Sequence, residues 1–344
     1  MRLLITGLHG FVGSNLVEAL KGEHTIYGLD IINPSKDGVE KTFSWDEIDE
    51  VLETSGTSDQ GRAHGSGLMV NGSPLEIDAI IHLAGKAHDT KNQSAADVYF
   101  KVNTGLTQKI FDWYLAHDSI KKFVFFSTAK AAADRVDGVL TENVTPAPVG
   151  PYGESKIAAE NYILEKFKDY SSHLSSLNSQ LTSKDVYIFR PCMIHGPGNK
   201  GNLNLLYGVV KKGIPWPLGA FENRRTFTSI ENICFAVNGV LTKDVPSGIY
   251  NMGDDEALST NELIEEICKS LGKKAHIWKL PKGLMDGIAK LGGILHLPLN
   301  PDRLQKLTEN YVSSNDKIKK ALGIDKMPVD ARSGLQRTLE SFRK

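Results

Sequence analysis

The sequence predicts an α/β fold: a Rossmann-like, doubly wound parallel sheet with a smaller α/β lobe towards the C-terminus. Over the first 190 residues, short apolar runs alternate with segments of helical spacing, and a glycine-rich turn follows the first apolar run. Such alternation is typical of parallel strands whose crossover helices cover both faces of the sheet. After Pro191, Gly, Pro and Asn residues become frequent, which indicates that a second lobe begins there.

The expected elements follow one another in a regular order. RLLIT and TIYGLD are predicted strands on either side of a helix in NLVEALKG, which together form a βαβ unit. Strands are then predicted in DAIIHLAG and KKFVFFST, with a helix at about residues 102–116 between them. A helix that starts at Tyr152 leads to a strand in DVYIFRP. Two segments poor in large apolar residues, 54–67 and 171–184, are expected to be surface loops.

These elements indicate two domains. The first is expected to span residues 1–190, and the second residues 191–344. The segments TFTSIENICFAVNGVL and GIYNMG, near residues 226–253, are predicted to return to the first domain. Helical segments near residues 261–271 and 331–342 are assigned to the second.

Composition excludes several classes of function. The 40 basic and 41 acidic residues of this 344-residue chain nearly cancel, so bulk charge gives no argument for nucleic acid as a partner. No apolar run approaches the roughly 20 residues that span a bilayer, and the N-terminus shows no signal-peptide pattern. We therefore expect a cytoplasmic protein without membrane insertion.

Cysteine and histidine spacing gives no sign of a metal site. Cys192, Cys234 and Cys268 are far apart and form no CxxC motif, and the ten histidines include no HExxH. Neither a disulfide framework nor a bound metal is expected.

The segment Thr6 to Gly13 reads TGLHGFVG and lies between a predicted strand and a predicted helix. In that context glycines permit a tight turn and bring backbone N–H groups close to a pyrophosphate. Asp30 ends the next predicted strand, where a carboxylate accepts hydrogen bonds from an adenosine ribose and repels a 2′-phosphate. A glycine-rich turn followed by an ordinary charged strand end is the alternative. Together the two features favour a dinucleotide site that takes NAD rather than NADP.

Tyr152 and Lys156 stand four residues apart in GPYGESKIAAE, so both side chains share one face of a helix. A solvated helix face would show the same spacing. A phenol has a pKa of about 10 and needs nearby positive charge to act as a base at neutral pH. We expect the Lys156 ammonium and an oxidised nicotinamide to lower the pKa of Tyr152, so that it exchanges a proton with a substrate hydroxyl.

Ser127 and Thr128 end the predicted strand KKFVFFST. Parallel sheets place ligands beyond the carboxyl ends of their strands, so a hydroxyl here can hydrogen-bond the reacting oxygen. A strand-end turn or a helix N-cap is the alternative role.

These motifs resemble the extended short-chain dehydrogenase/reductase family, in particular its nucleotide-sugar epimerases and dehydratases. The resemblance rests on TGxxGxxG, IIHLAG, Asn103 in VNTGLT, FFST and the Tyr152–Lys156 pair, and it covers nearly the whole chain. It implies that Thr128, Tyr152 and Lys156 are catalytic, with Ser127 beside them, and that Asn103 helps to hold the lysine. The residues implied to bind NAD are Gly7, Gly10, Phe11, Val12, Gly13, Asp30, Leu83, Ala84, Gly85, Lys86, Asn103 and Lys156.

The segment from His195 to Ile233 further resembles the substrate lobe of bacterial UDP-hexose 4-epimerases and 4-ketosugar reductases. The resemblance implies a UDP-sugar substrate whose diphosphate contacts Asn202, Arg225 and Arg303, since guanidinium groups pair with phosphate oxygens. A surface charge pair is the alternative interpretation of Arg224-Arg225. Family members of this kind also pair two helices into a homodimer, for which Ile110, Leu115, Ile157 and Ile163 are candidates unless they pack in their own core.

At two places the sequence departs from the family's patterns, and these departures narrow the range of expected reactions. The family's 4,6-dehydratases carry an Asp-Glu pair after the catalytic threonine, whereas Ala129 and Lys130 stand here. Met193 replaces an asparagine common in galactose epimerases. We therefore expect an NAD-dependent 4-epimerase of a UDP-hexose or UDP-N-acetylhexosamine, in surface polysaccharide synthesis. A reductase of a UDP-4-keto-6-deoxy sugar is the first alternative, and a non-catalytic dinucleotide-binding sensor the second.

Overall fold

The computed structural model describes eight stretches of the chain. The predicted loop 54–67 lies outside them, as do residues 177–182 of the predicted loop 171–184. The first residues of that second loop instead continue a helix, α6 (Pro151–Ser176). The described residues are 1–45, 69–70, 73–74, 76–86, 95–176, 183–199, 201–295 and 299–343.

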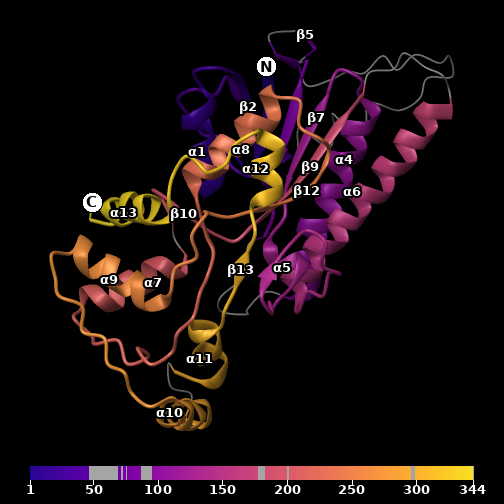
Figure 1. Ribbon diagram of the computed structural model, residues 1–344. Helices are drawn as coiled ribbons and strands as arrows, with labels where there is room; N and C mark the ends of the chain where they lie inside the picture. Colours follow the sequence, from indigo (N-terminus) through magenta and orange to yellow (C-terminus); the bar gives the residue numbers. More distant parts are fainter. Residues whose placement is uncertain are drawn as a thin grey trace. The chain divides into compact units, whose positions relative to one another are not determined.

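The largest sheet among the described residues has seven strands (Figure 1). Its strand order is β12-β9-β7-β6-β1-β2-β3, and every pairing from β9 to β3 is parallel. The prediction of an α/β fold with a parallel sheet is therefore confirmed. The strands are β1 (Arg2–Thr6), β2 (Thr25–Asp30), β3 (Lys41–Ser44), β6 (Ala79–His82), β7 (Lys122–Phe126), β9 (Asp185–Pro191) and β12 (Gly248–Met252).

Helices connect these strands as crossover segments. The helix expected at residues 102–116 is interrupted by a π-helical turn, η1, which often marks a functional site. Before it lies a single turn, α3, and after it the regular helix α4. The segments are α1 (Phe11–Leu20), α3 (Ala96–Tyr99), η1 (Phe100–Gly105), α4 (Leu106–Ala116), α5 (Ala129–Ala132) and α8 (Ile230–Thr242).

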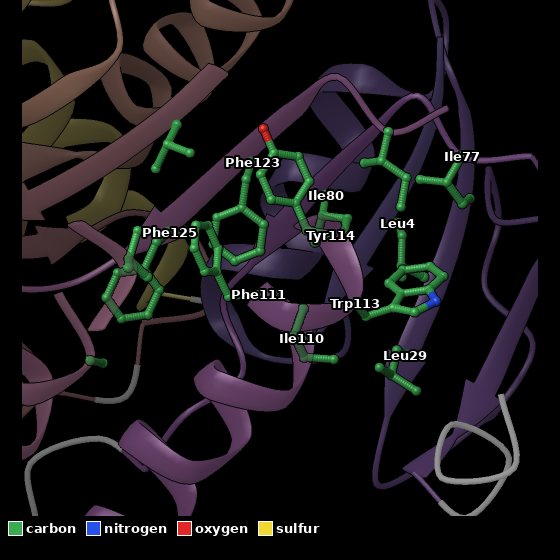
Figure 2. Close-up of a cluster of buried hydrophobic side chains, with 14 of the residues drawn as sticks. Leu4, Leu29, Ile77, Ile80, Ile110, Phe111, Trp113, Tyr114, Phe123 and Phe125 are labelled. Carbon is green, nitrogen blue, oxygen red and sulfur yellow. The ribbon is translucent and has the colours of Figure 1, made fainter. Parts of the chain in front are cut away.

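Aromatic side chains fix α4 against the sheet (Figure 2). Phe111 and Tyr114 pack on Phe123 of β7, with ring centroids 5.0 and 5.2 Å apart. The Tyr114 hydroxyl donates to the carbonyls of Lys121 (3.2 Å) and Asp185 (3.0 Å), which precede β7 and begin β9. Burying each such ring stabilises the fold by about 2 kcal/mol. The cluster therefore fixes α4 against β7 and the start of β9.

Two of the four side chains considered for a dimer interface belong to this core. Ile110 and Ile163 are fully buried in the same cluster, so they pack within their own chain and do not reach a second copy. Leu115 and Ile157 are only partly buried.

The chain divides into two compact units. The first comprises residues 1–134, 144–190 and 236–250, and the second residues 135–143, 191–235 and 251–344. The short segment 135–143 thus belongs to the second unit, although it lies between two strands of the first along the chain.

The second unit has its own core, built around Leu203, Trp216, Phe227 and Ile267. Among the described residues of either unit, no helix is long and apolar enough to cross a membrane. The remaining elements are β4 (Met69–Val70), β5 (Ser73–Pro74), β8 (Val139–Leu140), β10 (Met193–His195), β11 (Phe227–Ser229), β13 (Val312–Ser313), α7 (Asn202–Lys211), α9 (Thr260–Ser270), α10 (Lys282–Ile294), α11 (Pro301–Thr308), α12 (Asp316–Leu322) and α13 (Ala331–Ser341).

Candidate active site

Gly7 and Gly13 of the turn between β1 and α1 stand where a side chain would collide with the backbone. Gly7 has a φ of +69°, and a Cβ added there would lie 2.9 Å from the backbone nitrogen of Ala84. A Cβ added at Gly13 would lie 2.5 Å from the carbonyl oxygen of Gly7. Gly10 is the N-cap of α1 and offers no side chain to its N–H groups. These groups and the helix dipole suit a pyrophosphate, so the turn fits a dinucleotide.

Asp30 accepts two backbone hydrogen bonds, one of which comes from this turn. Its carboxylate oxygens accept from the N–H of His9 (2.8 Å) and from that of Ile31 (2.7 Å), and the residue is buried. A carboxylate oxygen accepts more than one hydrogen bond, so Asp30 keeps capacity for ribose hydroxyls. Its position at the end of β2 is the one expected for a residue that reads the ribose.

The buried His82 links the ends of β1 and β6 to helix α4. His82 Nδ1 lies 2.7 Å from Thr6 Oγ1, and Nε2 lies 2.9 Å from Thr107 Oγ1. Because Thr107 donates its proton to the carbonyl of Asn103, its oxygen must accept from Nε2. His82 therefore carries a proton on Nε2, and its buried environment keeps the ring neutral. Burial, aided by the charge of Lys156, lowers the pKa of His82 to about 3.

Asn103 lies in the π-helical turn η1 and is fully buried. Its Oδ1 accepts from the N–H of Lys86 (2.7 Å), and its Nδ2 donates to the Lys86 carbonyl (3.2 Å) and to Ser155 Oγ (3.0 Å). It thus joins the segment after β6 to α6. A Cβ at Gly85 would lie 2.9 Å from Asn103 Oδ1 and 3.1 Å from Lys156 Nζ, so Asn103 and Lys156 come close at this glycine.

Tyr152 is the second residue of α6, and its hydroxyl is hydrogen-bonded to Thr128. Its ring packs edge-on against the ring of Tyr99, with centroids 6.3 Å apart. Lys86 Nζ lies 5.7 Å from the centre of the Tyr99 ring. Burial, aided by Tyr99, raises the pKa of Tyr152, although the bond to Thr128 opposes this.

Lys156 lies one turn further along α6 and is buried. Its Nζ donates to the carbonyl of Phe126 (2.8 Å) and lies 4.9 Å from the ring centre of Phe125. Burial lowers the pKa of Lys156 to about 8, and the negative charge of Glu160 opposes the shift. The ammonium therefore titrates close to neutral pH.

The structure separates the two hydroxyls at the end of β7. Thr128 caps α5 by accepting from the N–H of Lys130 and reaches Tyr152. Ser127 instead donates its proton to the buried carboxylate of Glu160. Of the two candidates, Thr128 is therefore the one in contact with Tyr152.

The proposed diphosphate residues all lie in the second unit. Asn202 is exposed and begins α7. Arg225 is half-buried, its Nη1 donates to the carbonyl of Lys306 on α11 (2.8 Å), and burial lowers its pKa. Arg303, also on α11, is exposed. The neighbouring Arg224 pairs instead with Glu262 at 3.6 Å, as a surface charge pair.

Tyr99, Glu160 and Arg190 are among the neighbours of the site that were not foreseen from the sequence. Glu160 stands four residues after Lys156, so the helical spacing that revealed Lys156 also carried this signal. Tyr99 and Arg190 reach the site only through the fold. Within the described stretches, no three His, Cys, Asp or Glu side chains gather to hold a metal ion.

Comparison of the sequence with known proteins shows a protein family to which the chain is similar. The model of the NAD dependent epimerase/dehydratase family matches residues 3–253. The chain is 28% identical to UDP-glucose 4-epimerase of Vibrio cholerae, over 99% of this chain and 95% of that protein. It is 26% identical to N-acetyl-alpha-D-glucosaminyl-diphospho-ditrans,octacis-undecaprenol 4-epimerase of Escherichia coli O157:H7, over 92% of this chain and 84% of that one.

A solved structure shows the same fold. UDP-glucuronic acid 4-epimerase from Bacillus cereus, in complex with NAD, aligns with a TM-score of 0.69 at 19% identity. The alignment covers 100% of this chain and 99% of that one.

Proposed function

The chain belongs to the NAD-dependent epimerase/dehydratase family, and we propose that it is a nucleotide-sugar 4-epimerase for a UDP-hexose or UDP-N-acetylhexosamine. The observation that carries the proposal is the hydrogen bond between Tyr152 and Thr128 beside the buried Lys156. It supplies a proton-transfer group whose position is fixed before substrate arrives. Such positioning is how acid–base groups contribute to rate.

In the proposed reaction, Tyr152 accepts the proton of the sugar C4 hydroxyl while the C4 hydrogen leaves as hydride. NAD, when bound, supplies the acceptor and later donor of that hydride. Thr128 hydrogen-bonds the reacting oxygen, and the Lys156 ammonium stabilises the ionised phenol. After the 4-keto sugar presents its other face, Tyr152 returns the proton, and the product differs from the substrate only at C4.

The residues after Thr128 argue against dehydration. Elimination of water needs a further acid and base near the sugar ring, but Ala129 carries no ionisable group. Lys130 turns its ammonium to the carbonyl (2.7 Å) and carboxylate (3.0 Å) of Asp134. Both relatives named above are also 4-epimerases by their names.

We assign the substrate diphosphate to Arg225, with Asn202 and Arg303 as further contacts. A guanidinium presents its donors in a fork that matches phosphate oxygens. The E. coli relative's diphospho-undecaprenol substrate supports a role for this chain in surface polysaccharide synthesis. We also propose a homodimer through α4 and α6, in which the partly buried Leu115 and Ile157 supply apolar contacts.

Proton NMR of the sugar C4 centre tests the proposal. Each UDP-hexose and UDP-N-acetylhexosamine is incubated with enzyme and a catalytic amount of NAD, and a C4-inverted product is expected without net change in NADH absorbance. If no UDP-sugar is inverted while a 4-keto sugar consumes one NAD(P)H per molecule, the chain is a reductase. Absence of both reactions, with NAD bound, identifies a dinucleotide-binding sensor.

A further inference from the structure

One face of α6 meets the end of β7 at three successive positions. Tyr152, Lys156 and Glu160 stand at intervals of four residues and therefore share that face. Tyr152 bonds to Thr128, and Lys156 Nζ donates to the carbonyl of Phe126 at 2.8 Å. Glu160 accepts the hydroxyl proton of the residue between them, Ser127. The chemistry proposed above uses the first two contacts and leaves the third without a role.

The third contact is a buried charge network. Arg190 of β9 donates from Nε to both carboxylate oxygens of Glu160 (3.1 and 3.0 Å) and from Nη2 to Oε2 (2.5 Å). The side chains of Glu160 and Arg190 are 0% and 2% exposed, so neither charge has access to water. Keeping an ion pair at this depth is costly, and replacing it by apolar side chains is often neutral or stabilising. Stability therefore does not explain why this ion pair lies one helical turn from Lys156.

We propose that Glu160 is a positioning residue of this site: through Ser127 it fixes the end of β7 against α6, which sets where Thr128 and Lys156 stand. The proposal rests on the proposed function only for its effect on turnover. Glu160 also places a negative charge one turn from the Lys156 ammonium. Among the described residues, His82 on β6 also interacts with that ammonium, and His82 is neutral. The guanidinium of Arg190 is paired with the Glu160 carboxylate itself.

The test compares Glu160→Gln with Glu165→Gln, an exposed position on the same helix. Glutamine keeps an acceptor for Ser127 but removes the charge. Competitive acetylation of the cofactor-free protein, with peptide mass spectrometry, gives the pH at which Lys156 titrates. Glu160→Gln is expected to move that titration down by about one pH unit, because Lys156 loses its negative neighbour. Glu165→Gln is expected to leave it at the parent value.

The kinetic arm uses whichever UDP-sugar the parent enzyme inverts. Glu160→Gln and Ser127→Ala are each expected to lower kcat, by about tenfold for the first, with KM unchanged, since neither residue touches substrate. A folded Glu160→Gln protein whose Lys156 titration and kcat both equal those of the parent would overturn the proposal. If the parent inverts no UDP-sugar, the proposed function fails, and the Lys156 titration alone decides the role of Glu160.

A variant that does not fold is replaced by the double variant Glu160→Met/Arg190→Met, which removes both buried charges together. A lowered Lys156 titration in that folded protein supports the proposal. A titration equal to the parent's, together with an unchanged kcat, shows that the pair is only structural and overturns it.

Discussion

The residues proposed for proton transfer and those proposed to hold the diphosphate are built in opposite ways. Thr128 and Lys156 are 8% and 5% exposed, and each is hydrogen-bonded within the first unit. Asn202 and Arg303 are exposed at the starts of helices, and Arg225 is half-buried with its Nη1 on a single backbone carbonyl. The first group is buried before ligand arrives, whereas the second is wholly or partly exposed to solvent. Changes in the first should therefore affect kcat, and changes in the second KM.

The largest expected effect is at Tyr152. Tyr152→Phe removes only the oxygen that transfers the proton and should lower turnover by about 10³-fold or more, while binding of NAD and UDP stays near the parent value. Tyr162→Phe is the matched control, because it removes a phenol of the same helix that bonds to Asp112. Turnover equal to the parent's in Tyr152→Phe would remove Tyr152 from the mechanism and end the contrast between the two regions.

Arg225 tests the other side of the comparison. Arg225→Leu should raise the KM for the UDP-sugar by about 10- to 100-fold, since a hydrogen bond from a charged group contributes about 1.5–3 kcal/mol. The value of kcat should stay close to that of the parent enzyme. Arg224→Leu, which removes the exposed partner of Glu262, is the control and should change neither constant. A loss in kcat alone would show that Arg225 acts in the chemical step.

Asp30 is proposed to bind the cofactor, yet it is buried like Thr128 and Lys156. The N–H groups of His9 and Ile31 fix its carboxylate. We expect NAD to bind at least about tenfold more tightly than NADP, which corresponds to about 1.4 kcal/mol. Asp30→Asn should reduce that preference by removing the repulsion of the 2′-phosphate. Calorimetric titration of cofactor-free protein with both dinucleotides measures it, and tighter binding of NADP by the parent contradicts this role.

The last expected effect concerns stability rather than rate. The pKa of His82 is about 3 in the folded chain and about 6.5 when unfolded, so between these values the unfolded state binds more protons. The free energy of unfolding should therefore fall as pH drops from about 6.5 towards 3. His82→Asn should be less stable at neutral pH but lose less stability across that window. Urea unfolding at several pH values measures both slopes, and equal slopes would mean that His82 does not titrate on unfolding.

The sequence by itself determined the glycine turn and the alternation of strands and helices over the first 190 residues, because both follow from local patterns. Gly7 and Gly13 sit where a Cβ would meet backbone, and that need is visible as a motif in the amino-acid sequence alone. The spacing of Tyr152 and Lys156 likewise placed them on one helix face. Local periodicity sets such relations, since it depends on residues only a few positions apart.

Only the tertiary structure decided which neighbours these residues have. Ser127 and Thr128 are adjacent in sequence, yet one meets Glu160 and the other Tyr152. Burial raises the pKa of Tyr152, because it disfavours the ionised phenol, and burial is set by elements far away in the chain. Arg190 reaches Glu160 across 30 residues of sequence, a contact that no local pattern encodes.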